Sequence, residues 1–411
     1  MLRARGITLN ANNPQRSTMA RLAVLCAVVL ALNACGGNGD SAAPPSVNAP
    51  PAPPPPVTAP PPPPHTVGNC AQLPQPGVWE EISPVPGNGP PAGAAGEGLK
   101  WGAARVLAHP AHSGTVYVSV LNHGIWKSTD CGSTWAKTNT GRNGALLDFG
   151  TQFSMHMVAT TAGDVLYVNN FQGLGGTLRM LVSKNGGVDW SLLYGDDVAK
   201  QVEFDGYGGD LSIDPADPQH LMVNFHANCI APNVGGCLAE SADGGTSWHI
   251  VPGPLGHWAE GARAYILTRT NWLHASHEGL WLTTNSGQKW TLVGQSGSDG
   301  GILDTQGVMY LPSDQGMLKS TDRGLAWSVM AGSPPTSSLV GTGTTIYTGF
   351  VFSSGTQVLS QASQANPTTW TRITGPQMGT NGGPWGLDYD HDHRVLYSAH
   401  HRSGLWRTVT P

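Results

Sequence analysis

The stretch Ser320-Thr-Asp-Arg-Gly-Leu-Ala-Trp327 recurs along the chain and decides the fold. In such a frame Asp or Asn folds its side chain back onto backbone N–H groups, Gly supplies a positive φ, and Trp anchors the outgoing strand. The frame is therefore predicted to be a repeated hairpin turn. Further copies of Ser/Thr-x-Asp/Asn-x-Gly-x-x-Trp begin at Ser128, Ser183, Ser241 and Thr283, and a degenerate copy runs from Ser363 to Trp370.

Two strand patterns align the repeats around these frames. A Gly-apolar strand such as Gly124-Ile-Trp126 leads into the frame, and a strand with an apolar-Tyr pair or its equivalent comes before that. Each unit is thus predicted to be a four-stranded meander, a to d, in which the frame forms the c–d turn. The seven pairs are Val116-Tyr117, Leu166-Tyr167, Met222-Val223, Leu273-His274, Met309-Tyr310, Ile346-Tyr347 and Leu396-Tyr397.

The last unit lacks its fourth strand. It stops at Gly404-Leu-Trp406-Arg-Thr-Val-Thr-Pro411, where a frame and a strand d should follow. A segment with the pattern of strand d, Gly77-Val-Trp79-Glu-Glu-Ile82, lies instead before the first strand a near Ala103. Pairing the two ends of the chain would remove the exposed sheet edge. We therefore predict an all-β, seven-bladed β-propeller, closed by an N-terminal strand that completes the last blade.

The frames match the Asp-box S-x-D-x-G-x-T-W, so from about residue 77 to 411 the chain resembles the sialidase-like Asp-box (BNR) repeat propeller superfamily. That superfamily includes sialidases, sortilin-type receptors and xyloglucanases. The resemblance implies a propeller with Asp-box turns, but one fold serves many functions.

Two mechanisms of that superfamily do not carry over to these residues. The Arg-Ile-Pro motif of sialidases is absent, so the sequence does not predict a sialidase. Xyloglucanases carry a catalytic Asp just after strand b of the first blade, whereas the matching stretch Tyr117-Val-Ser-Val-Leu-Asn-His123 has no carboxylate.

The composition bounds the class of partner. Of 411 residues only 11% are charged, the net charge is −5, and there are 55 Gly and 33 Pro. Few charges and many turn formers are typical of an all-β protein with short strands. No basic surface is indicated, so nucleic acid is not an expected partner, and we expect a monomer.

The first 69 residues read as export and spacer segments. A basic start and an apolar run from Met19 end at Leu32-Asn33-Ala34-Cys35, which resembles the bacterial lipobox. We predict a lipoprotein signal peptide over 1–34, with Met19 as an alternative start, and acylation of Cys35, which would attach the protein to the cell envelope by lipid alone. Residues 35–69 form a Pro-rich spacer and 70–411 the propeller. The alternative is an ordinary signal peptide with an incidental cysteine.

Four cysteines remain in the predicted mature domain, and an even number in an exported protein indicates two disulfides. Three pairings are possible. We favour Cys229 with Cys237, which would staple one loop, and Cys70 with Cys131 by elimination. Neither spacing nor ligand set resembles a zinc site, and no metal or cofactor is predicted.

The meander divides the candidate residues between two faces. The frames and the a–b turns share one face, the frame face, and the b–c and d–a loops share the other, the loop face. Asp388-Tyr-Asp390-His-Asp392-His-Arg394 resembles a calcium loop but falls in an a–b turn and lacks the following Gly and Glu. The functional site is therefore expected on the loop face.

The loop-face candidates are polar and aromatic residues of the kinds that bind sugars, because rings stack on sugars and charged groups hold hydroxyls and carboxylates. The catalytic candidates are His226, His277, His400, Glu260 and Asp314. The substrate-binding candidates are His123, Arg142, Trp258, Arg263, Trp385 and Arg402.

Two hypotheses follow. The first is an enzyme acting on extracellular polysaccharide, either a glycosidase with a carboxylate pair such as Glu260 and Asp314, or a lyase with a histidine base and an arginine clamp on a uronate. Some secreted seven-bladed propellers that resemble this chain are such lyases. The second is a non-catalytic surface propeller that binds a glycan or an envelope protein. The sequence favours the enzyme.

Overall fold

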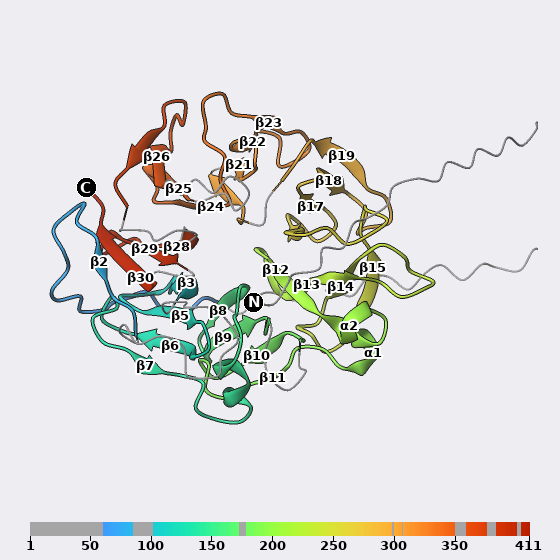
Figure 1. The fold of residues 1–411 in the computed structure, drawn as a ribbon, viewed down its shortest axis with the longest axis horizontal. Helices are drawn as coiled ribbons and strands as arrows, with labels where there is room; N and C mark the ends of the chain where they lie inside the picture. The colour runs from blue at the N-terminus through green and yellow to red at the C-terminus, as the bar shows by residue number, and fades with distance from the viewer. Residues whose placement is uncertain are drawn as a thin grey trace, which may run out of the picture. The chain divides into compact units, whose positions relative to one another are not determined.

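The computed structural model describes residues 61–84, 102–171, 178–297, 300–305, 307–349, 359–375, 384–400 and 404–411. These residues contain seven four-stranded sheets, each ordered as a meander, and form a seven-bladed β-propeller (Figure 1). The predicted fold class is confirmed. The helices of this described part include none that is long and apolar enough to cross a membrane.

The strands follow the predicted order a, b, c, d, with strand a innermost. Blade 1 consists of β3 (Ala103–Ala108), β5 (Val116–Val120), β6 (Gly124–Ser128) and β7 (Ala136–Lys137), and blade 2 of β8 (Met155–Thr160), β9 (Gly163–Val168), β10 (Leu181–Ser183) and β11 (Ser191–Leu192). Blade 3 consists of β12 (Gly208–Asp214), β13 (Asp217–Asn228), β14 (Gly236–Ser241) and β15 (His249–Pro252). Blade 4 consists of β16 (Arg263–Ile266), β17 (Trp272–Ser276), β18 (Gly279–Thr283) and β19 (Thr291–Gly294).

The remaining blades complete the ring. Blade 5 consists of β20 (Leu303–Thr305), β21 (Val308–Leu311), β22 (Leu318–Ser320) and β23 (Ser328–Val329). Blade 6 consists of β24 (Ser338–Gly341), β25 (Thr345–Gly349), β26 (Leu359–Ser363) and β27 (Thr371–Ile373). Blade 7 consists of β28 (Pro384–Asp390), β29 (Val395–His400), β30 (Gly404–Val409) and the N-terminal β2 (Glu80–Glu81). Outside the blades lie β1 (Thr66–Val67), β4 (His112–Ser113), the 3₁₀ helix η1 (Gly144–Asp148), α1 (Asp196–Ala199) and α2 (Glu203–Gly206).

The frames form the predicted hydrogen-bonded turns. In the first, Ser128 Oγ accepts the N–H of Gly132 at 2.8 Å, and Asp130 Oδ1 accepts the N–H of Thr134 at 2.8 Å. Cys131 and Gly132 have φ of 60° and 90°, so the turn holds two successive left-handed residues. Gly324 of the fifth blade has a φ of 86°, which favours glycine, and a Cβ there would lie 2.7 Å from Leu267 Cδ1 of the neighbouring blade.

Apolar layers between adjacent blades form the core. Trp190, the last residue of the second frame, is fully buried against Tyr117 and Ile125 of the first blade. Trp272 packs likewise against Met222 and Leu238 of the third. Each blade therefore buries its apolar side chains against its neighbour, which makes stability depend on a complete ring.

The N-terminal segment closes the ring as predicted. Strand β2 pairs antiparallel with β30 through Glu80–Arg407 and Glu81–Trp406, and the two lie side by side in Figure 1. Arg407 is 2% exposed, binds Glu80 Oε2 at 2.8 Å and donates to the Cys131 carbonyl at 2.7 Å. A buried arginine thus joins both ends of the chain to the first blade.

Both favoured disulfides are confirmed. Cys70–Cys131 has a Cα separation of 5.4 Å and ties the N-terminal segment to the first frame. Cys229–Cys237 has a Cα separation of 4.7 Å and closes the loop between β13 and β14. Beside the first disulfide, β1 pairs in parallel with β4.

A buried ion cluster runs across the four strands of the third blade. His220 is fully buried and binds Asp214 Oδ2 at 2.9 Å and Glu240 Oε1 at 2.8 Å. Burial alone would lower the pKa of His220, but hydrogen bonds to the two carboxylates raise it to about 9. Burial would raise the pKa of Glu240, but hydrogen bonds from His220 and His249 lower it to about 2.

Replacing His220 by alanine should lower the free energy of unfolding by about 3–5 kcal/mol, because two buried carboxylates lose their shared cation. The stabilisation from the raised histidine pKa is complete below pH 6.5 and is lost as the pH rises through about 9. The difference in the free energy of unfolding between the unmodified chain and His220→Ala, measured with denaturant, should therefore be smaller at pH 10 than at pH 6. His249→Ala is the control: it removes a 62% exposed side chain from the same Glu240 and should cost less than about 1 kcal/mol. Equal losses in the two variants would contradict this assignment.

Candidate functional site

Four of the five predicted catalytic residues form two histidine–carboxylate pairs on the loop face. His226, near the end of β13, binds Glu260 of the loop between β15 and β16, with 3.0 Å between Nε2 and Oε2. His277, after β17, binds Asp314, after β21, through Nδ1 and Oδ2. The sequence predicted these four residues as catalytic candidates but did not indicate which histidine pairs with which carboxylate.

The two pairs meet at one corner. A Cβ on Gly261, the residue after Glu260, would lie 3.4 Å from His277 Nε2. The His277 ring therefore has the Glu260–Gly261 segment on one side and Asp314 on the other. Blades 3, 4 and 5 thus bring Glu260 and Asp314 to a common region of the loop face.

Aromatic rings flank the His226–Glu260 pair. The ring centroid of His226 lies 4.3 Å from that of Trp258 and 5.0 Å from that of Tyr207. The Trp258 backbone N–H donates to Asn228 Oδ1 at 2.6 Å, which fixes the loop that carries the ring. Glu260 itself is 76% exposed at its side chain. The pair thus offers solvent a carboxylate beside partly exposed rings.

A third pair of the same kind marks the rim. His257 Nε2 binds Glu278 Oε1 at 2.9 Å, and both side chains are exposed. This exposed rim pair has the same residue types as the His226–Glu260 pair and serves as a reference for the two pairs above.

Beneath the loops, the inner strands hold a buried polar cluster. Asp210 binds Arg263, and its Oδ1 accepts from Ser154 and, at 3.0 Å, from His156 Nε2. Burial would raise the pKa of Asp210, but the Arg263 charge and these hydrogen bonds hold it well below the usual carboxyl value. Burial lowers the pKa of His156. Asp210 and Ser154 both contact the same His156 nitrogen, so the group is no proton relay of the Ser-His-Asp type.

This cluster corrects one expectation and adds residues that sequence reasoning missed. Arg263 was expected to clamp a substrate carboxylate, whereas its carboxylate partner in the structure is Asp210. Ser154 and His156 were not predicted from the sequence, although their two-residue spacing at an inner strand places both side chains on one side of the sheet.

Asp210→Asn should lower the free energy of unfolding by about 3–5 kcal/mol at neutral pH, because Arg263 loses its buried counter-ion. A lowered carboxyl pKa stabilises the fold above the usual carboxyl range and ceases to do so as the pH falls. The deficit should therefore shrink under acidic conditions in urea unfolding. The exposed Asp197→Asn should unfold like the unmodified chain, and a variant Asp210→Asn that did the same would refute the ion-pair assignment.

The remaining candidates are dispersed. His400 is fully buried, with Ser398 Oγ at 2.8 Å from its Nε2, so it does not share a surface with His226 and His277. His123 is partly buried, and burial lowers its pKa. Trp385 lies on β28 with its ring centroid 4.7 Å from that of Phe153. Arg402 and Cys35 lie outside the described residues.

Arg142 was expected on the loop face as a substrate-binding residue, and the structure shows it exposed, with backbone contacts to the next blade. Its backbone N–H donates to Asp189 Oδ1 at 2.6 Å, and its carbonyl accepts from Trp190 N–H at 2.9 Å. Both partners belong to the second frame. These contacts hold the backbone of the segment after β7 against the frame turn of the next blade.

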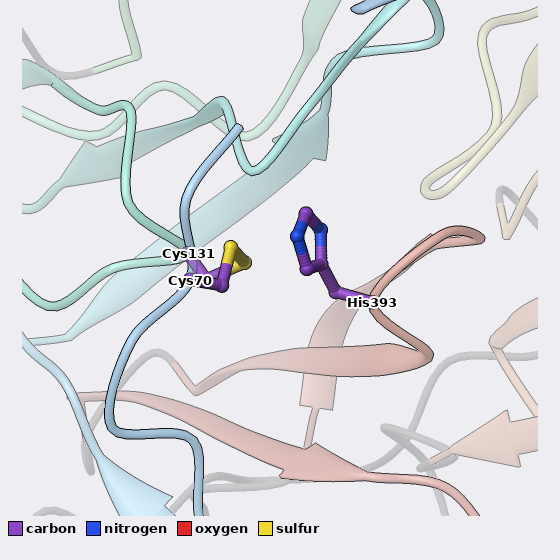
Figure 2. Close-up of side chains that lie close together, drawn as sticks. All are labelled: Cys70, Cys131 and His393. Carbon is purple, nitrogen blue, oxygen red and sulfur yellow. A yellow bond between two sulfur atoms is a disulfide. The ribbon is translucent and has the colours of Figure 1, made fainter. Parts of the chain in front are cut away.

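One group of potential metal ligands lies elsewhere. Figure 2 shows the His393 ring beside the Cys70–Cys131 disulfide, with ligand atoms within 4.8 Å of one another. The two sulfurs are bonded to each other, so neither is a thiolate ligand. His393 Nε2 and Nδ1 lie 3.0 Å from the Gly68 carbonyl and 2.7 Å from Ser113 Oγ. These contacts explain His393 as a residue that holds the N-terminal segment.

The seven four-stranded sheets define a β-propeller. No family model and no curated protein sequence matches the chain. The chain is similar to an ancestral GH74 enzyme (18% identity, TM-score 0.39, covering 80% of this chain and 37% of that one). It is also similar to the GH74 xyloglucanase from Xanthomonas campestris, at 15% identity and a TM-score of 0.42, covering 80% of this chain and 61% of that one. A further similar structure is YCF48 from Cyanidioschyzon merolae, at 11% identity and a TM-score of 0.48, covering 81% of this chain and 98% of that one. At these identities and TM-scores the similarities carry no argument about function.

Proposed function

We propose that this chain is an exported, lipid-anchored propeller with Asp-box turns that hydrolyses an extracellular polysaccharide at the corner formed by Glu260 and Asp314. The observation that carries the proposal is that His277 lies between the Glu260–Gly261 segment and Asp314. The rings of Trp258 and Tyr207 pack against His226, the partner of Glu260. Glycoside hydrolysis needs two carboxyl groups that flank the glycosidic bond.

In this reaction one carboxyl group protonates the glycosidic oxygen as the bond to the anomeric carbon breaks. The other carboxylate activates water or attacks that carbon. His226 and His277 act as positioning residues, because each holds a carboxylate by a hydrogen bond. Trp258 supplies a face for an apolar sugar surface.

A lyase receives less support from the described residues. It needs an arginine to neutralise the uronate carboxylate, but the carboxylate partner of Arg263 in the structure is Asp210. The exposed carboxylates of Glu260 and Glu278 and the partly exposed carboxylate of Asp314 would also repel a polyanionic chain. We therefore expect an uncharged polysaccharide.

Non-catalytic glycan binding is the second candidate. It is favoured by the 76% exposure of the Glu260 side chain, because a catalytic acid normally keeps its proton in an enclosed environment. The two functions differ in whether a bound polysaccharide is cut.

The purified full chain should release reducing ends from at least one neutral polysaccharide of a plant and microbial panel. Glu260→Gln and Asp314→Asn should each lower kcat by about 10²-fold or more, because each removes an acid–base or nucleophilic group. Glu278→Gln, a change of the same kind in the rim pair, should leave turnover near that of the unmodified chain. Binding without release of reducing ends would establish the second candidate. A chain that neither binds nor cleaves any polysaccharide of the panel would refute both candidates.

The anchor has its own test. Expressed in a bacterium with a lipoprotein pathway, the chain should incorporate a labelled fatty acid and fractionate with membranes, and Cys35→Ser should do neither. Equal membrane association of both forms, without label, would contradict acylation at Cys35.

A further inference from the structure

Six partly exposed rings form a continuous series on the loop face, here called the aromatic row. Successive members lie 4.3 to 5.7 Å apart between centroids, and all six side chains are neither buried nor fully exposed. In spatial order the row is Trp258, His226, Tyr207, Phe171, Phe153 and Trp385.

The row crosses from the proposed reaction corner toward the far side of the ring. Trp258 lies just before blade 4, His226 and Tyr207 belong to blade 3, Phe171 and Phe153 to blade 2, and Trp385 to blade 7. Its members come from loops and strand ends distant in sequence. No periodic pattern relates them, so the row is a product of the fold.

Hydrogen bonds fix the backbone segments that carry the rings. The N–H and carbonyl of Phe171 pair with those of Thr151 at 3.0 and 2.9 Å, and the His226 N–H donates to the Tyr207 carbonyl at 2.9 Å. Arg105 donates to the carbonyls of both Phe153 and Trp385. Segments held by such contacts need little ordering on binding, as a preorganised binding surface requires.

We propose that the aromatic row binds a linear, uncharged polysaccharide along its length, so that the chain is recognised internally over several sugar units, with the unit at the Trp258 end presented to Glu260. This inference rests on the proposed function and names its substrate class. Sugar rings expose apolar C–H faces that stack on aromatic rings. A single sugar would contact one or two of the six rings, whereas a chain contacts them in succession.

The test measures affinity against ligand length. Full-length protein carrying Glu260→Gln, which binds without turnover, is titrated with cello-, manno- and xylo-oligosaccharides from disaccharide to hexasaccharide. Affinity should rise with length for at least one series. Phe171→Leu and Phe153→Leu, which keep apolar volume but remove the ring, should each weaken hexasaccharide binding about two- to tenfold. Phe149→Leu, which changes a 43% exposed phenylalanine outside the row, should not.

The outcomes separate this inference from the proposed function. Thermal unfolding first establishes that the leucine variants remain folded. Hexasaccharide binding unchanged in both variants, or affinity independent of length, would overturn the aromatic row as the binding surface, while cleavage that depends on Glu260 would leave the proposed function standing. If no oligosaccharide binds and the polysaccharide panel is not cut, both fail together.

Discussion

The structure depends on the pairing of the two ends of the chain. Strand β2 supplies the fourth strand of the last blade, and Arg407 binds Glu80 and the Cys131 carbonyl at the same place. Without β2, strand β30 would expose an unpaired edge, and the apolar layers on either side of the last blade would lose packing contacts. The aromatic row reaches from blade 7 through blade 2 to the loop before blade 4, so its geometry requires a closed ring.

Much of the fold was predictable because its determinants are local or topological. The Ser–Asp–Gly–Trp frames specify turns through hydrogen bonds within eight residues, and the missing strand d could be found by counting. The disulfides followed because four cysteines allow few pairings. Each of these features is readable from spacing alone.

The site was predicted only in part because loops obey no spacing rule. The positions of His226, His277, Glu260 and Asp314 followed from the blade alignment, but their pairing depends on how the loops fold over neighbouring blades. The segment of Arg142 binds Val188 and Asp189 of the next blade, a contact that the repeat spacing did not predict. Ser154, His156 and Asp210 form a buried cluster that only the packed inner strands bring together. The loop face thus combines a buried ion cluster that stabilises the inner strands with exposed carboxylates above it.

Polysaccharide bound along the aromatic row of the loop face would be seen in a crystal structure of the Glu260→Gln chain with a bound hexasaccharide. Sugar density is expected along Trp258, Tyr207 and Phe171, with a glycosidic oxygen near residue 260. Sugar bound at the frame face, or on the loop face away from these rings, would contradict this expectation.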